Sequence, residues 1–154
     1  HQKPSSIELA NIAIGVAQNA KKLGFIPKVA ILSYSNFGNP AGSNTKTINE
    51  CLKILDDRKV SFEFDGEMTA EVALDYNLIK ENYPFCKLSG PANVLIMPDL
   101  YSANISFKLL QKMENLSVIG PIMIGGNNPF QIVQMGASVS DIVNSACIST
   151  YNSL

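Results

Sequence analysis

The fold of this chain is decided by the stretch KVAILSYSNFG, residues 28–38. Its apolar part, residues 29–32, is short and continuous, which is typical of a strand that is buried on both faces of a parallel sheet. Small polar residues follow from Ser33 to Asn44, with Gly38 and Gly42 among them. The stretch therefore predicts a buried strand that ends in a polar loop.

Helical patterns flank this strand on both sides. Before it, Ser5-Ser6-Ile7-Glu8 has the form of a capping box, apolar residues then recur on one helical face, and Gly24 supplies a stop. After it, four apolar residues fall at the spacing of a single helix face. They are Ile48, Cys51, Leu52 and Leu55.

The alternation continues to the end of the chain. Further strands are predicted at 60–64, ending at Asp65-Gly66, at 93–97, and at 117–124, where Gly120-Pro121 interrupts the run. Further helices are predicted from about Thr69, at 102–113, and at 138–150 with Ser138 as N-cap. Strands that alternate with helices indicate an α/β fold with a mostly parallel sheet and helices on its faces.

Composition excludes several classes of protein. The 154 residues are 46% hydrophobic and 16% charged, and twelve basic against thirteen acidic residues give a net charge of −1. These values argue against disorder, and the absence of a basic patch argues against nucleic acid and acidic membranes as partners. The low charge also suggests that part of the surface is covered by a partner or by a further segment of chain.

The cysteines and the histidine limit the kinds of metal site, disulfide and catalysis that the chain could contain. Cys51, Cys86 and Cys147 are odd in number and match neither a zinc spacing nor a disulfide framework, so we expect a reducing, cytoplasmic location and no metal site. The one histidine, His1, is terminal, which argues against Ser-His or Cys-His catalysis within the chain.

Three loops could carry ligands, because ligands of open α/β sheets bind beyond the carboxyl ends of the strands. Residues 33–38 could offer backbone N–H groups to a phosphate, or could be a plain connecting loop. Residues 65–71 carry Asp65, Glu67 and Glu71, which could serve acid–base chemistry or a cation; we favour the simpler reading that Asp65 and Glu67 stabilise the positive end of the next helix.

The third loop, residues 129–136, carries no ionisable group. Asp141 beyond it is most simply a helix-start residue, and Lys112 is most simply a solvated charge near a helix end. From the residues alone, the sequence predicts an α/β domain and does not identify its ligand.

Five blocks together resemble the phosphate acetyl/butyryltransferase family. They are Val29–Ser35, Asp65-Gly66-Glu67, Ala92–Leu100, Asn104–Lys108 and Ile119–Ile122. The resemblance runs from about Ile7 to Thr150 and implies a three-layer α/β fold in two lobes, similar to isocitrate and isopropylmalate dehydrogenases. A complete family domain is roughly twice this long. We therefore expect residues 1–154 to be a single lobe from the second half of such a domain, with a last helix at about 138–150 that could pack on the other lobe.

Active members of the family move an acetyl group between coenzyme A and phosphate. Their Leu-Ser-Arg-Gly motif, which supplies a serine and an arginine to catalysis, falls on Val133-Gln134-Met135-Gly136, where only the glycine remains. A second arginine falls on Lys112, the loop lysine is lost at Phe37, and the catalytic aspartate is retained as Asp141. Because acyl phosphates are anions that require directed cations, the resemblance predicts little or no transferase activity.

Two segments of the sequence resemble one subgroup of this family in particular. Ser35-Asn36-Phe37-Gly38 and Pro129–Val133 resemble the appended C-terminal domain of large bacterial malic enzymes. That resemblance implies a regulatory and oligomerisation domain, a dimer or larger, that responds to acetyl-CoA and has an N-terminal malic enzyme module as its partner. NAD(P) and a divalent metal would belong to that module, with no cofactor in this part. An active acyltransferase and a purely structural dimerisation module remain the alternatives.

The resemblance and the strand-end positions together predict a set of ligand-contacting residues. They are Ser33, Ser35, Asn36, Asn104, Lys112, Gln134 and Asp141.

Overall fold

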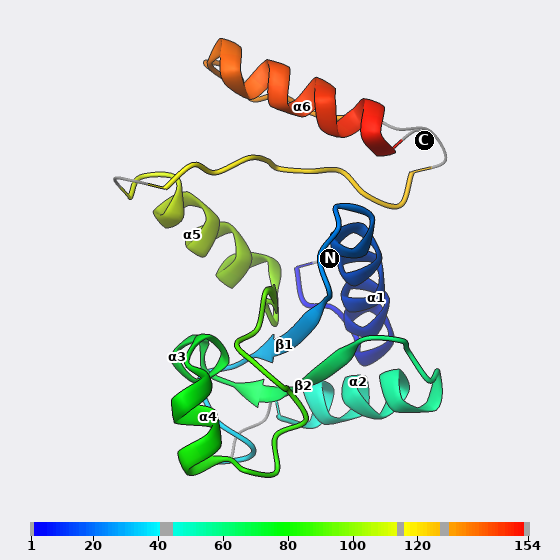
Figure 1. Cartoon of the computed structure of the whole chain (residues 1–154), viewed down its shortest axis with the longest axis vertical. Helices are drawn as coiled ribbons and strands as arrows, with labels where there is room; N and C mark the ends of the chain where they lie inside the picture. Colours follow the sequence, from blue (N-terminus) through cyan, green and yellow to red (C-terminus); the bar gives the residue numbers. More distant parts are fainter. Residues whose placement is uncertain (1, 41–44, 114–115, 127–129, 153–154) are drawn as a thin grey trace. The chain divides into compact units, whose positions relative to one another are not determined.

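The computed structural model describes residues 2–40, 45–113, 116–126 and 130–152 (Figure 1). The chain forms two compact units, His1–Asn104 and Ile105–Leu154. The elements of the first unit are α1 (Ser6–Lys22), β1 (Lys28–Leu32), α2 (Thr45–Asp57), β2 (Glu63–Met68), α3 (Ala70–Leu74), α4 (Tyr76–Asn82) and β3 (Val94–Ile96). Helix α5 (Leu100–Leu110) starts in the first unit and ends in the second, which also holds α6 (Val139–Asn152).

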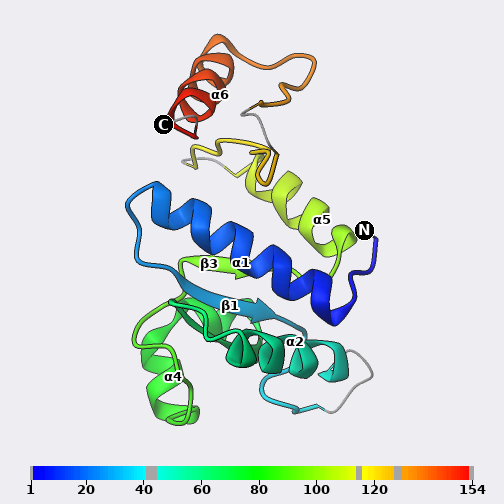
Figure 2. The ribbon, with the colours of Figure 1, turned by 90° about the vertical axis from the view of Figure 1, so that its right-hand side faces the viewer.

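The sheet of the first unit is parallel and has the order β2-β1-β3. The central strand is β1, the stretch that the sequence marks as buried on both faces, and Val29, Ala30 and Ile31 are fully buried. Figure 2 shows β3 beside α1. The predicted α/β fold with a parallel sheet is confirmed.

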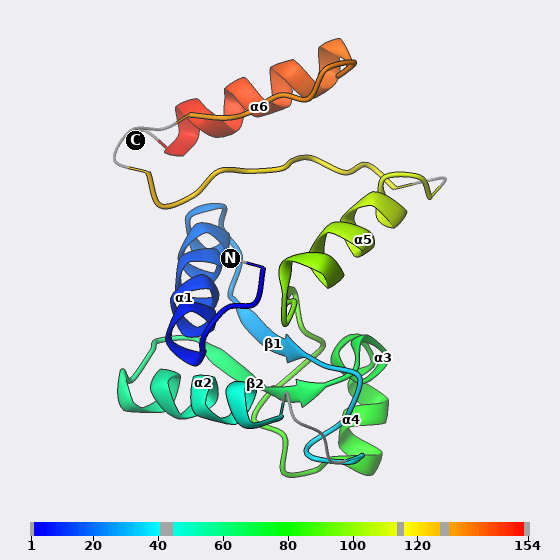
Figure 3. The same cartoon turned by 180° about the vertical axis from the view of Figure 1, so that it is seen from behind.

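Alternate residues of β1 enter two separate cores. Val29 and Ile31 pack in one core with residues of α1 and α2, whereas Ala30 and Leu32 pack in the other with residues of α3 and α4. This follows from the two-residue period of a strand, which sends successive side chains to opposite faces. Figure 3 shows α3 and α4 together beyond the end of β2. The first unit therefore has helices on both faces of its sheet.

The helix predicted at 102–113 instead spans Leu100–Leu110, whereas the predicted starts at Ser5 and Ser138 and the predicted stop at Gly24 agree with the structure. Ser5 and Glu8 form the capping box of α1, because the Ser5 hydroxyl accepts from the Glu8 N–H while the Glu8 carboxylate accepts from the Ser5 N–H. Gly24 ends this helix at a φ of +89°, a left-handed conformation that favours glycine. At the far end, Ser138 and Asp141 cap α6 in the same reciprocal way.

Two predicted strands are corrected. The strand expected at 60–64 instead runs over Glu63–Met68, so Asp65 and Glu67 lie inside β2 rather than after it. Burial of their carboxylates is tolerated because hydrogen-bond donors from other segments reach them. The strand expected at 117–124 is not formed over the described residues 116–126. Pro121 in that run has no N–H to give to a ladder.

Candidate functional site

The loop that follows β1 is fastened to the end of β2. The Ser33 N–H donates to the Met68 carbonyl at 2.9 Å, and the Phe37 N–H donates to the Glu67 carbonyl at 2.8 Å. In return, the Asn36 side-chain oxygen accepts from the Thr69 N–H at 2.8 Å. These bonds fix residues 33–38 at the carboxyl edge of the sheet, where ligands of α/β folds bind.

Glu67 is the centre of this arrangement. The register between β1 and β2 shifts after Ile31, so that Glu67 lies in a bulge, a feature that re-aims a side chain. Glu67 is 1% exposed, and its Oε1 accepts from the Ser35 hydroxyl at 2.5 Å and from the Gly38 N–H at 3.1 Å. Its Oε2 is buried and has no hydrogen-bond partner in the described part of the chain.

This geometry bears on the predicted phosphate cradle. The backbone N–H groups of Ser33, Asn36, Phe37 and Gly38 already donate to acceptors of this chain. A phosphate at the loop would have to displace these bonds, and each buried group left without a partner would cost about 1–3 kcal/mol. These four N–H groups are therefore not free to cradle a phosphate.

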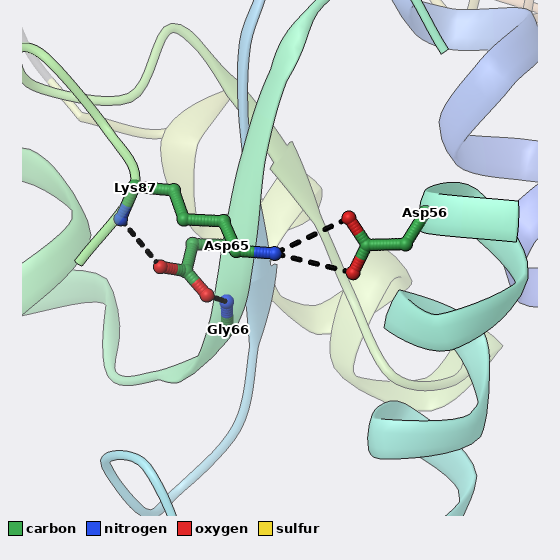
Figure 4. Close-up of polar contacts among 4 residues, drawn as sticks. All are labelled: Asp56, Asp65, Gly66 and Lys87. Carbon is green, nitrogen blue, oxygen red and sulfur yellow. Dashed lines mark hydrogen bonds and ion pairs between the residues drawn. The ribbon is translucent and has the colours of Figure 1, made fainter. Parts of the chain in front are cut away.

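Asp65 is satisfied by local contacts (Figure 4). It is 9% exposed, and its two carboxylate oxygens accept from the Gly66 N–H at 2.9 Å and from the Lys87 N–H at 2.7 Å. The Lys87 amine extends to the Asp56 carboxylate of α2, with N–O distances of 3.1 and 3.3 Å. The cap of α3 is Thr69, so the favoured placement of Asp65 and Glu67 at a helix start is wrong.

The Lys87–Asp56 ion pair is expected to add little to stability. Both side chains are more than half exposed, at 57% and 56%, and such pairs contribute ~0.2–1 kcal/mol. We expect Asp56→Asn to lower the free energy of unfolding by less than about 1 kcal/mol. Urea denaturation at low and high salt tests this, and a loss of several kcal/mol would show that the pair holds the Asp65 network together.

A cavity of about 300 Å³ lies within the second unit. Lys112, Gln134, Met135 and Asp141 line it, together with Gln111, Leu116, Val118, Ile119, Gly120, Ile132, Val133, Gly136, Ala137 and Ser145. Its volume is at the lower end of the range for ligand pockets. Three of the predicted contact residues thus meet at one cavity.

Lysines supply the positive charge at this cavity. Lys112 is in its lining, and the Lys108 amine, one helical turn earlier on the chain, donates to the Gln134 side-chain oxygen at 3.2 Å. Lys108 was not among the residues predicted to contact a ligand; its spacing of four residues from Lys112 was the available signal. A lysine is a point charge that lacks the planar fork with which arginine binds a phosphate.

Asp141 is engaged in capping α6. Hydrogen bonds from the Ser138 hydroxyl and N–H, at 2.8 and 2.9 Å, lower the pKa of this carboxyl below its ordinary value. A lowered pKa makes the group a weaker proton acceptor than a free aspartate. The predicted helix-start role is confirmed, and Asp141 also belongs to the lining of the cavity.

The remaining candidates are placed as follows. Ser33 is half-buried, Ser35 is buried and Asn36 is half-buried, all in the loop after β1. Asn104 is exposed on α5.

Burial raises the pKa of Cys51 to about 11 and that of Cys86 to about 11, which disfavours a thiolate nucleophile at either position. The described residues contain no cluster of three or more metal-ligating side chains.

Comparison with known proteins gives consistent matches. The model of the phosphate acetyl/butaryl transferase family matches residues 1–150. An NADP-dependent malic enzyme of Rhizobium meliloti is 51% identical over 152 residues, 99% of this chain and 20% of that protein. A phosphate acetyltransferase of Helicobacter pylori is 39% identical over 95% of this chain and 28% of its own length.

A solved structure agrees with these matches. The EutD phosphotransacetylase from Staphylococcus aureus superposes with a TM-score of 0.89 at 29% identity, over 100% of this chain and 48% of that protein. The chain thus spans about a fifth of the malic enzyme relative and about half of this transacetylase. Among the described helices, none is long and apolar enough to cross a bilayer.

Proposed function

Because the chain belongs to the phosphate acetyl/butaryl transferase family, we propose that it is a non-catalytic, acetyl-CoA-responsive region of a malic enzyme. The chain is 51% identical to a malic enzyme and 39% identical to a phosphate acetyltransferase. This difference supports a malic enzyme, rather than a free-standing transferase, as the protein to which the chain belongs. The oxidative decarboxylation of malate, with NADP and a divalent metal, would belong to an N-terminal module of the same protein.

One observation carries the non-catalytic part of the proposal. The cavity is lined by Gln134 and Met135, the two positions on which the resemblance places the serine and the arginine of active family members. Met135 is fully exposed and offers neither charge nor hydrogen-bond donor. Since directed donors supply much of the transition-state stabilisation in acyl transfer, their absence supports binding without turnover.

A separate observation supports a role in assembly. Helix α5 has no buried residue, and its apolar side chains are more than half exposed at Leu100, Tyr101, Ile105 and Leu109, with values of 52%, 56%, 62% and 63%. An apolar face of this kind is typical of a surface that another segment or subunit covers. We propose that the parent module or a second copy of the chain covers it.

Calorimetric titration of the full-length protein with acetyl-CoA tests the binding part. The wild type should bind, and Lys112→Ala should weaken the affinity about tenfold through loss of a charge-assisted contact. Lys53→Ala, an exposed lysine on α2, serves as the matched control and should leave the affinity unchanged. No binding by the wild type would leave the purely structural role, and equal affinity of both variants would remove Lys112 from the site.

A further inference from the structure

The outer edge of β3 has no neighbouring strand in the described part of the chain, because the sheet order is β2-β1-β3. On its inner side, the Asn93 N–H donates to the Lys28 carbonyl at the start of β1. Backbone groups of successive residues in a strand point to opposite sides, so those of Val94 and Ile96 point to the outer edge. Both residues are nevertheless buried, at 5% and 3% exposure. Unpaired backbone groups at buried residues cost free energy, which favours a further strand at this edge.

An apolar groove of about 300 Å³ lies at the same edge, and we call it the edge groove. Its lining includes Ile12 and Val16 of α1, residues 95–97 at the end of β3, and Leu100 and Ala103 at the start of α5. Helix α1 lies beside β3 (Figure 2). Ile12 is 44% exposed and Leu100 is 52% exposed. Because parallel sheets are normally covered, a groove of this kind is typical of a surface on which another segment packs.

The helices of the sheet indicate where a strand that precedes α1 would lie. The crossover from β1 to β2 uses α2, and the crossover from β2 to β3 uses α3 and α4. These two crossovers move across the sheet in opposite directions, and their helices lie on opposite faces, as the right-handed rule requires. Since α1 shares its core with α2, a parallel strand that α1 connects to β1 must lie on the β3 side of β1. The free position on that side is the outer edge of β3.

The first described residues of the chain lie at this edge. The Leu100 N–H donates to the Gln2 carbonyl at 3.3 Å, and Pro4 belongs to the lining of the edge groove. Gln2 is therefore close to the carboxyl end of β3. A segment that follows β3 and leads into Gln2 would run parallel to β3, and α1 would then return the chain to the amino end of β1. Such a segment is available in a longer protein, since this chain spans 20% of its malic enzyme relative.

We infer that an extended segment of the full-length protein, directly before Gln2, pairs with the outer edge of β3 as a further parallel strand. Its backbone would bond to Val94 and Ile96, and its apolar side chains would cover the edge groove. The upstream part of the protein would thus be joined to this sheet by main-chain hydrogen bonds. This inference rests on one part of the proposed function, namely that the chain is a region of a longer malic enzyme, and acetyl-CoA plays no part in it.

Hydrogen exchange of the full-length protein, measured at single amides, tests the pairing without any substitution. The Leu95 N–H points toward β1 and is the internal reference. The Val94 and Ile96 N–H groups should exchange at rates within about tenfold of the Leu95 rate, because amides paired in one sheet open together. If either group exchanges more than about tenfold faster than Leu95, the inference is overturned.

Photo-crosslinking identifies the segment that occupies the edge groove. With p-benzoylphenylalanine in place of Ile12, the full-length protein should form a link to a peptide of the same chain directly before Gln2. The same substitution at Ile7, which is 57% exposed on α1 and is not in the lining of the groove, is the matched control and should not form this link. A link from position 12 to a second copy or to residues 105–154, or no link at all, would overturn the inference. Neither experiment uses acetyl-CoA, so a failure of acetyl-CoA binding would defeat the proposed regulation and leave this inference standing.

Discussion

Replacement of Gly66 by alanine is expected to lower the free energy of unfolding by about 3 kcal/mol. A Cβ at this position would lie 2.7 Å from the carbonyl oxygen of Ile31 and 3.0 Å from its Cβ. Ile31 is fully buried in the central strand, so its backbone cannot move aside without disturbing both cores. Urea denaturation of the 154-residue chain, followed by circular dichroism, measures the effect.

Gly90→Ala provides the control for this prediction. Its new Cβ would be 3.3 Å from the amine of Lys28, the far end of a flexible side chain, so we expect a change of less than about 1 kcal/mol. Equal urea midpoints for the two variants would contradict the described pairing of Ile31 with Gly66.

The second large effect concerns catalysis. The full-length protein is expected to form acetyl-CoA from acetyl phosphate at a negligible rate, and the double variant Gln134→Ser, Met135→Arg is expected to raise that rate about 100-fold or more. The reason is that the variant returns a hydroxyl and a planar cation to the lining of a cavity that already has Lys112 and Asp141. A spectrophotometric assay of thioester formation measures the rate.

A double variant that changes the same positions without adding a functional group serves as the control. Gln134→Asn with Met135→Leu changes the same two positions but adds neither hydroxyl nor cation, and should remain inactive. Robust turnover by the wild type would refute the non-catalytic proposal and favour the active acyltransferase, with Lys108 and Lys112 as its cations.

The parts of the fold that depend on neighbouring residues were predictable from the sequence. The capping boxes at Ser5 and Ser138 act within one helical turn, and the buried strand at 29–32 is a continuous apolar run. The extent of β2 was not predictable in this way. Glu67 is buried only because Ser35 and Gly38, about 30 residues away in the sequence, come close enough to donate to it.

The residues of the candidate site likewise divide into those that the sequence predicted and those whose role depends on tertiary contacts. The family resemblance selected Lys112, Gln134 and Asp141, which the structure brings to one cavity, and Ser33, Ser35 and Asn36, which it brings into one loop. Lys108 was assigned no role and Glu67 was wrongly expected at a helix start, because their partners are fixed by tertiary contacts across 26 and 32 residues. Ligand contact by Asn104, exposed on α5, stays a prediction.

The central claim is that this region binds acetyl-CoA in order to regulate rather than to catalyse. Regulation requires that acetyl-CoA binds one state of the parent enzyme better than another. The most direct measurement is the rate of malate decarboxylation by the full-length protein during a titration with acetyl-CoA. We expect a saturable change in that rate, reduced at sub-saturating acetyl-CoA by Lys112→Ala. A rate that does not change at any acetyl-CoA concentration would contradict the account.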